Sequence, residues 1–435
     1  MVQGILIIVF FVVIAALIMT KKIPTLLALP LLAIIICVIA GVPMVGKNAD
    51  GAEIGWLQTV FEAGTTRMAS AIMAGIFGAW LGSLMNKTGV TTTMIKKSAE
   101  LGGDRPFVVT IALFAVVALL FTVLGGLGCI IMVGSIVIPI LISVGVPALS
   151  AACIFLMSFT TGLTFSIGNW QTYSSLFNLD IQTIKGFEIW LLCGTAIATI
   201  LFIIIEFKKN GIKFSFAAPA ETAEKKEAPT LHGFTGVMCM LSPIIPIVLV
   251  AVFKVPVTVA FTVGILWLLI FSFKGFNKAM NLLTQTCYEA ISNVGPATIL
   301  MIGIGILYLA VTHSMVKEVL NPFLLAVIPS KKIIYIIFFA ILAPLSLYRG
   351  PMNLFGLGSG LAGLIMGLGT LPPLAVMGAF LASERIQGCG DPTNTQNAWT
   401  ANFAEVDVNT CTKKMLPYLW AIAVYGVIVS AIIYL

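Results

Sequence analysis

Two polar runs interrupt a sequence that is otherwise mostly apolar. They are GNWQTYSSLFNLD (residues 168–180) and GCGDPTNTQNAWTANF (residues 388–403). The chain of 435 residues is 59% hydrophobic and only 9% charged, so these amides, hydroxyls and acid stand out. Asn and Gln side chains both donate and accept hydrogen bonds, which suits them to the hydroxyl and carboxylate groups of a small polar solute.

The two runs share a pattern, because Asn169 and Gln171 of the first align with Asn394 and Gln396 of the second. Irregular backbone at membrane depth is tolerated only where it is packed in protein or lines a cavity. Interrupted segments at corresponding places of two halves are typical of secondary transporters, in which they mark the binding site.

The sequence therefore predicts a binding site between the two breaks. Freed amide groups and half-helix N-termini can face an anion there, while carbonyls and hydroxyls can coordinate a cation. The expected solute-binding residues are Ser166, Asn169, Gln171, Thr172, Arg349, Thr393, Asn394, Thr395, Gln396 and Asn397. The expected cation-binding residues are Gly168, Asn169, Asp391 and Asn394.

Asp391 is the sharpest single candidate, because an acid in a membrane break is costly and is by default functional. It is expected to bind Na⁺, with a proton shuttle and a helix cap as the alternatives. Arg349 is expected to hold a carboxylate in its guanidinium fork, with an ordinary topology charge as the alternative. Glu384 and Arg385 precede the second break and are expected to pair with each other, with direct ligation as the alternative.

Apolar stretches of about 18–20 residues recur along the chain, and each can cross a hydrocarbon core of ~30 Å. They predict an all-α polytopic membrane protein with about seven spanning segments in each half. Seven is odd, so the second half is inverted, which gives two inverted-topology repeats with interrupted helices or re-entrant hairpins at the midplane. The expected spans are 2–20, 23–44, 68–86, 107–124, 128–145, 148–183, 187–206, 235–253, 256–273, 293–312, 332–347, 352–369, 372–404 and 416–434.

The expected organisation is a first repeat over residues 1–206, a polar linker over 207–234 and a second repeat over 235–435. Lysine and arginine residues are biased toward the side that holds the linker, which favours a cytoplasmic linker and two external termini. Asp180 and Asp407 follow the two breaks at matching places and are expected at the membrane surface.

Other function classes find little support. The net charge of +7 is spread over short loops, as topology signals are, so no nucleic-acid partner is expected. The cysteines stand singly in apolar segments, which favours buried thiols over a metal site or a disulfide framework. The sequence contains no nucleophile–base pair that would indicate an enzyme, and no cofactor is expected.

Three stretches resemble the gluconate permease family: GIFGAWLGSLMNKTGVTTTMIKKSAELGGDR (residues 75–105), VGSIVIPILISVGVP (residues 133–147) and SLFNLDIQTIKGF (residues 175–187). More loosely, they resemble the citrate–metal transporters of the wider ion transporter superfamily. The resemblance covers most of residues 57–206. It implies a homodimeric secondary carrier of the bacterial inner membrane, for carboxylates driven by H⁺ or Na⁺. The chain has SIGNWQTYSS (residues 166–175) where gluconate permeases carry a run rich in proline and histidine.

The predicted function is a symporter that couples Na⁺ or H⁺ to a small organic anion, such as a hydroxy- or dicarboxylate resembling citrate or gluconate. The alternatives are a cation/proton antiporter of the same superfamily and an amino-acid symporter. The expected partners are the carboxylate solute and the lipid bilayer.

Overall fold

The computed structural model describes residues 2–47, 51–212, 231–273, 275–325, 328–329 and 331–435. Within these ranges the regular elements are helices, and one isolated β-bridge joins Lys47 to Glu53. The described residues contain six helical runs long and apolar enough to cross a membrane, or eight if each of two bent pairs is one span. The chain is an all-α, multi-pass membrane protein, as the sequence predicts.

The first half contains α1 (Val2–Met19), α2 (Thr25–Ala40), the π-helix η1 (Leu57–Glu62), α3 (Ala63–Arg67), α4 (Ala69–Thr88), α5 (Val90–Gly102), α6 (Pro106–Leu120), α7 (Leu127–Ser143), α8 (Ala148–Thr164), α9 (Ile167–Phe177) and α10 (Ile181–Asn210). The second half contains α11 (Gly233–Met240), α12 (Ile244–Ala251), α13 (Val257–Phe271), α14 (Phe276–Thr312), α15 (Ser314–Leu325), α16 (Lys332–Leu342), the 3₁₀ helix η2 (Ala343–Arg349), α17 (Gly358–Leu368), α18 (Pro373–Gly390), α19 (Thr395–Phe403) and α20 (Val408–Tyr434).

The two halves follow one order of elements. Each begins with apolar helices, continues with a long helix and a short one, and then has two helices joined by a tip that is not α-helical. A broken helix comes next, α8–α9 in the first half and α18–α19 in the second, and a long helix closes each half. This shared order is consistent with the expected inverted repeat.

Both broken helices lie where the polar runs predict them. α8 and α9 meet at an angle of 58°, and residues 391–394 separate α18 from α19. The helices that follow begin at aspartate caps: an Asp180 carboxylate oxygen accepts from the Gln182 backbone N–H, and one of Asp407 accepts from that of Thr410. Capping explains why an acid occupies the same place in both halves.

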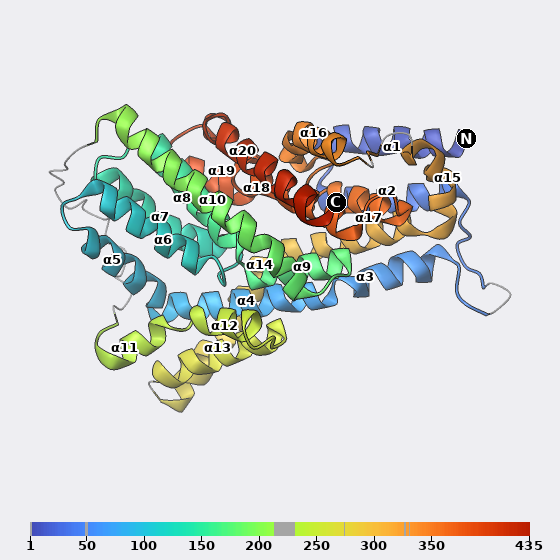
Figure 1. The fold of residues 1–435 in the computed structure, drawn as a ribbon. Coiled ribbons are helices and arrows are strands. Elements are labelled where there is room, and N and C mark those ends of the chain that lie inside the picture. Colours follow the sequence, from blue (N-terminus) through green and yellow to red (C-terminus); the bar gives the residue numbers. More distant parts are fainter. Residues whose placement is uncertain (1, 48–50, 213–230, 274, 326–327, 330) are drawn as a thin grey trace.

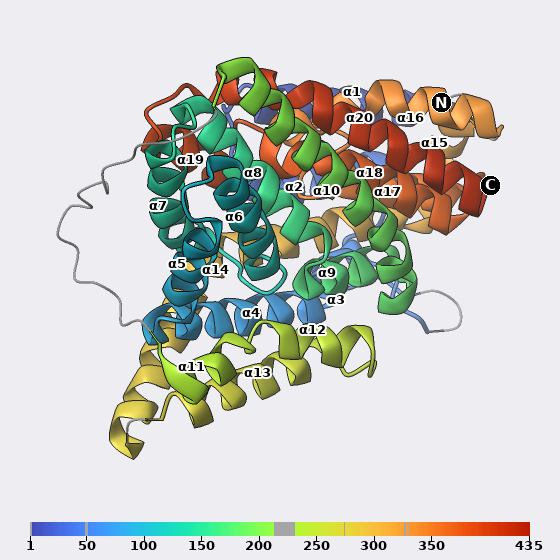
Figure 2. The same ribbon diagram turned by 60° about the vertical axis from the view of Figure 1, so that its left-hand side comes forward.

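The long helices of the two halves hold the molecule together. α4 and α14 pack against each other; α2 of the first half packs on α14, and α13 of the second packs on α4. Figures 1 and 2 show α11, α12 and α13 on the outer side of α4. At the centre lies α18, in which each residue from Ala375 to Gly390 is buried, with α8, α10, α17, α20 and η2 around it.

Several expected spans differ from the structure. The expected span 235–253 is the bent pair α11–α12, and the expected spans 68–86 and 293–312 are parts of longer helical runs. The expected spans 332–347 and 352–369 flank a long tip, because α16 ends at Leu342 and α17 begins only at Gly358. Proline at 344 and 351 explains the interruption, since proline donates no backbone hydrogen bond.

The ends of the expected linker are helical. α10 continues to Asn210, and α11 begins at Gly233, so both helices extend into the expected range 207–234. The rest of the linker, residues 213–230, lies outside the described residues.

Glycines set the closest approach between α3 and α14. A Cβ atom added at Gly305 would overlap the carbonyl oxygen of Gly64, and one added at Gly64 would lie 2.6 Å from the Cα of Ile306. Because backbone stands on both sides of this crossing, a neighbouring side chain cannot rotate away to make room.

We therefore expect Gly305→Ala to lower the thermal stability of the purified protein, by the equivalent of about 1–3 kcal/mol. Gly295→Ala is the matched control, since Gly295 lies in the same helix with no heavy atom within 4 Å of an added Cβ. Equal melting temperatures for the two variants would show that the glycine crossing does not limit the packing.

Candidate functional site

A cavity of about 950 Å³ lies between the two broken helices. It is lined by Ser166, Gly168, Asn169, Thr172, Arg349, Thr393, Asn394, Thr395 and Gln396 among the residues predicted from the sequence. Most of the predicted residues, from both halves, therefore line one cavity. Gln171, Asp391 and Asn397 lie outside its lining.

Other elements complete the wall. The first tip, residues 121–126, contributes Gly125 and Gly126, and the middle of α14 contributes Asn293. Gly126 has a φ of 84°, which favours glycine, and a Cβ added at Gly128 would lie 2.8 Å from the Asn293 side-chain nitrogen. The glycine run GGLG therefore allows the tip to approach α14, which is a packing role, as expected for small residues in membrane helices.

Side-chain N–H groups of the breaks donate to backbone carbonyls at the ends of the preceding helices. In the first half, Asn169 Nδ2 donates to the carbonyl of Leu163 at 3.3 Å, and Trp170 Nε1 donates to that of Thr164 at 3.2 Å. In the second half, Asn394 Nδ2 donates to the carbonyl of Gln387 at 2.9 Å. The aligned asparagines thus make the same kind of bond.

Asn397 and Thr172 are also used by the chain itself. Asn397 Nδ2 donates to the carbonyl of Asp391 at 2.8 Å, and Thr172 Oγ1 donates to that of Gly168 at 3.0 Å. By contrast, the side chains of Ser166, Thr395 and Gln396 make no hydrogen bond to another described residue, and all three line the cavity. Their polar groups are free to meet a solute.

Asp391 joins the second break to the second tip, residues 343–357. Its Oδ1 accepts from the backbone N–H and the hydroxyl of Thr393, at 2.8 Å and 2.7 Å. Its Oδ2 accepts from the backbone N–H of Arg349 at 3.1 Å and from Asn353 Nδ2 at 3.4 Å. Asp391 is wholly buried, and its four donors belong to Thr393 and to the tip, so its carboxylate makes no cap bond to α19.

Arg349 occupies a strained place at this tip. Tyr348 and Arg349 have φ angles of 56° and 60°, a left-handed conformation that few residues other than glycine adopt. The Arg349 side chain lines the cavity, and its Nη1 donates to the carbonyl of Phe355 at 3.1 Å. The bond from Asp391 to the Arg349 backbone helps to hold this conformation, and four guanidinium hydrogens remain for a ligand.

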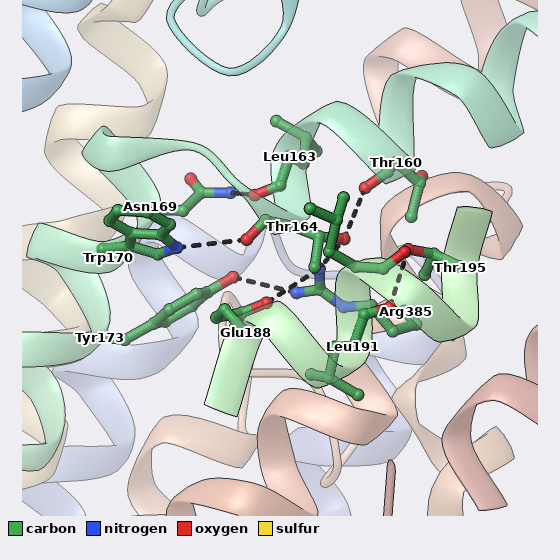
Figure 3. Close-up of polar contacts among 11 residues, drawn as sticks. Thr160, Leu163, Thr164, Asn169, Trp170, Tyr173, Glu188, Leu191, Thr195 and Arg385 are labelled. Carbon is green, nitrogen blue, oxygen red and sulfur yellow. Dashed lines mark hydrogen bonds and ion pairs between the residues drawn. The ribbon is translucent and has the colours of Figure 1, made fainter. Parts of the chain in front are cut away.

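A buried ion pair connects the halves next to the cavity (Figure 3). Arg385 Nη1 lies 3.6 Å from Glu188 Oε2 and donates to Thr164 Oγ1 at 2.6 Å. Arg385 Nη2 donates to the Tyr173 hydroxyl at 3.5 Å. The expected pairing of Arg385 with Glu384 is wrong, because consecutive helical residues do not face each other; the partner is Glu188, on α10.

Sequence reasoning missed Glu188, Thr164 and Tyr173. Glu188 lies among apolar residues of α10, and an intramembrane acid is by itself a signal of function, so that signal was present. Thr164 and Tyr173 carried no comparable signal, because their role depends on how α8, α9 and α18 meet.

Comparisons with known proteins identify solved structures that share the fold. No protein-family model matches the chain, and no curated protein matches its sequence. Among solved structures it is similar to the YdaH transporter of Alcanivorax borkumensis, with a TM-score of 0.62 and 13% identity over 99% of this chain and 98% of that one. It is also similar to MtrF of Neisseria gonorrhoeae, of a class of antimetabolite efflux pumps, with a TM-score of 0.61 and 13% identity over 95% of both chains.

At 13% identity the likeness shows the fold. The chain has the fold of two solved transporters, which agrees with the expected transporter fold. The likeness does not extend to the gluconate permease or citrate transporter families in particular.

The hydrogen bonds of Asn394 lead to a prediction about stability. Asn394→Ala removes the side-chain donor to the Gln387 carbonyl and the acceptor of Gln387 Nε2, and the loss of buried hydrogen bonds costs about 1–3 kcal/mol. We expect a lower melting temperature for this variant, whereas Gln396→Ala, in the same break but without such a bond, should melt within about 0.5 kcal/mol of the unaltered protein. Similar losses in both variants would contradict a capping role for Asn394.

A further prediction distinguishes a structural role of Asp391 from a role as a Na⁺ ligand. An asparagine at this position would turn an N–H₂ group toward one set of donors, so Asp391→Asn should lower the melting temperature equally in NaCl and in KCl, by about 1–3 kcal/mol. Asp180→Asn is the control, since asparagine caps helices as well as aspartate does. If Na⁺ stabilised the unaltered protein over K⁺ and the variant lost only that gain, Asp391 would be an ion ligand.

Proposed function

We propose that this chain is a secondary active transporter that carries a small organic anion, a hydroxy- or dicarboxylate, together with a coupling cation, Na⁺ or H⁺. The observation that carries the proposal is the cavity between two broken helices at corresponding places of the two halves. Its volume of about 950 Å³ lies within the range of small-molecule sites, roughly 300–1,000 Å³.

The charges around the cavity favour an anion. Lys21, Arg349 and Glu384 are the Asp, Glu, Lys and Arg residues of the described lining. The excess of positive charge attracts a carboxylate, and the guanidinium of Arg349 offers a planar fork of donors to it. The unpaired groups of Ser166, Thr395 and Gln396 suit the hydroxyls of a hydroxy acid.

Each broken helix also meets the tip-bearing helices of the other half. α19 packs on α7, and α9 packs on α17, so the cavity is enclosed by elements of both repeats. At one end it reaches Lys21, an exposed residue that follows α1. With the orientation favoured by the Lys and Arg bias, that end faces the cytoplasm, which supports an inward-open carrier in the bacterial inner membrane as part of the proposal. The homodimer is part of the same proposal.

A cation/proton antiporter is the second candidate, and the buried acid Glu384 at the cavity favours it. Uptake of a labelled organic acid into liposomes separates the two candidates, because an antiporter of inorganic cations would carry none. The same liposomes measure the direction of transport. Direction matters because MtrF belongs to a class of efflux pumps.

The function is tested by ligand-induced stabilisation of the purified protein against hydroxy acids, dicarboxylates and amino acids, in NaCl and in KCl at matched ionic strength. A ligand that binds only the folded state stabilises it, by about 2.7 kcal/mol at 100 times its dissociation constant. We expect a shift with a carboxylate. A shift with an amino acid alone, or with an inorganic cation alone, would replace the proposal with the corresponding alternative.

Arg349→Gln should weaken binding of that carboxylate about 10- to 150-fold, because a hydrogen bond to a charged group contributes about 1.5–3 kcal/mol. Isothermal titration calorimetry measures the affinity, and the melting temperature without ligand reports any loss from the bond to Phe355. Gln171→Ala, in the first break but outside the lining, is the control and should bind normally. An unchanged affinity in Arg349→Gln would remove Arg349 from the site.

A further inference from the structure

Five ionisable side chains lie close together beneath the second break: Glu188, Glu384, Asp391, Arg349 and Arg385. Glu188, Glu384, Asp391 and Arg385 are each at most 4% exposed. The cluster contains three acids and two arginines, so it carries one excess negative charge when each acid is ionised. An uncompensated charge in a buried site is costly, and such a group tends to become neutral instead.

Asp391 has hydrogen-bond partners, whereas Glu188 has an ion-pair partner and no hydrogen bond among the described residues. Asp391 accepts four hydrogen bonds, from the backbone N–H of Arg349, Asn353 Nδ2, and the N–H and hydroxyl of Thr393. Glu188 faces Arg385 at 3.6 Å, and this guanidinium is fixed by Thr164 and Tyr173.

Glu384 is the acid that remains. It is 4% exposed, and its Oε2 has no hydrogen-bond partner among the described residues. Glu384 also lines the cavity, so water in the cavity can deliver and remove a proton. It is therefore the one member of the cluster that combines an unpaired oxygen with access to the transport path.

The elements packed around α18 supply few other charges. α8 and α17 contain no Asp, Glu, Lys or Arg, and Lys414 of α20 lies 2.6 Å from Glu206, outside the cluster. The charged groups that interact electrostatically with Glu384 are Arg385, Glu188 and Arg349. Tyr173 also lies close to it. Cys389 is the other titratable side chain in this part of α18.

We propose that Glu384 is the proton-binding residue of the transporter, and that the coupling ion is H⁺. This inference rests on the proposed function, which leaves the choice between Na⁺ and H⁺ open. The proton comes from water in the cavity when it is open to one side of the membrane, and it returns to water when the cavity is open to the other.

Charge explains how the proton and the solute are coupled. A carboxylate held by Arg349 would be repelled by an ionised Glu384 on the same cavity wall, whereas a protonated Glu384 is neutral and can donate a hydrogen bond. The bound anion therefore strengthens proton binding, and the bound proton strengthens anion binding by the same factor. The two are carried together because each is held weakly alone.

Infrared spectroscopy tests the proton directly, without a solute. A protonated carboxyl group has a C=O stretching band that an ionised one lacks and that shifts in D₂O. We expect this band in the purified protein at neutral pH and its loss in Glu384→Gln. Glu62→Gln removes an exposed acid and should leave the band unchanged.

Two results would overturn the assignment: a spectrum of Glu384→Gln identical to that of the unaltered protein, or loss of the band in Glu188→Gln but not in Glu384→Gln. Should Glu384→Gln not fold, Glu384→Asp keeps a carboxyl group and should move the band rather than remove it. A band that Glu384→Asp leaves at its original frequency would contradict the proposal equally.

Transport in sodium-free liposomes tests the coupling, with labelled gluconate, citrate and succinate as probes. One pH unit across the membrane can drive about tenfold accumulation of a monocarboxylate carried with one proton. Glu384→Gln should only equilibrate the solute across the membrane. The infrared band at Glu384 without uptake of any acid would reject the anion function but keep the proton site. Uptake that requires added Na⁺, in a protein without the band, would keep the anion function and reject the proton site.

Discussion

A helix that breaks inside a membrane must satisfy its freed backbone groups from within the protein, since lipid offers no hydrogen bonds. This constraint organises both halves of the chain. Asn169 and Asn394 each donate a side-chain amide hydrogen to a carbonyl at the end of the preceding half-helix. Trp170 Nε1 and Asn397 Nδ2 donate to the carbonyls of Thr164 and Asp391. Much of the polarity of the two runs is thus used to build the breaks. The polar groups that are not used in this way remain free at the cavity.

The second break carries a further task that the first lacks. Asp391 accepts hydrogen bonds both from Thr393, within the break, and from Arg349, within the tip, so the guanidinium reaches the cavity at a place set by the break itself. One aspartate thus holds the second break and the second tip together, and it fixes the backbone of Arg349 at the cavity.

The fold could be predicted well from the sequence, because two properties are local. Apolar length indicates spanning helices, and polar runs inside apolar stretches indicate breaks. The boundaries of α16 and α17 were harder, since the long tip depends on Pro344, on Pro351 and on the left-handed residues Tyr348 and Arg349. The candidate site could be predicted in part: Ser166, Thr395 and Gln396 line the cavity, whereas Gln171 belongs to the same motif as Asn169 and points elsewhere.

The error at Glu384 and Arg385 shows why pairing is the hardest step. The two residues are neighbours in sequence, but successive side chains on a helix do not face each other, so an ion pair between them is disfavoured. Arg385 instead meets Glu188, which is 197 positions earlier in the chain, and no local pattern encodes that distance. Because Arg385 pairs with Glu188, it does not neutralise Glu384, and the cations that share the cavity lining with Glu384 are Lys21 and Arg349. The charge balance of the site therefore follows from how the two halves pack, and the composition of either polar run does not determine it.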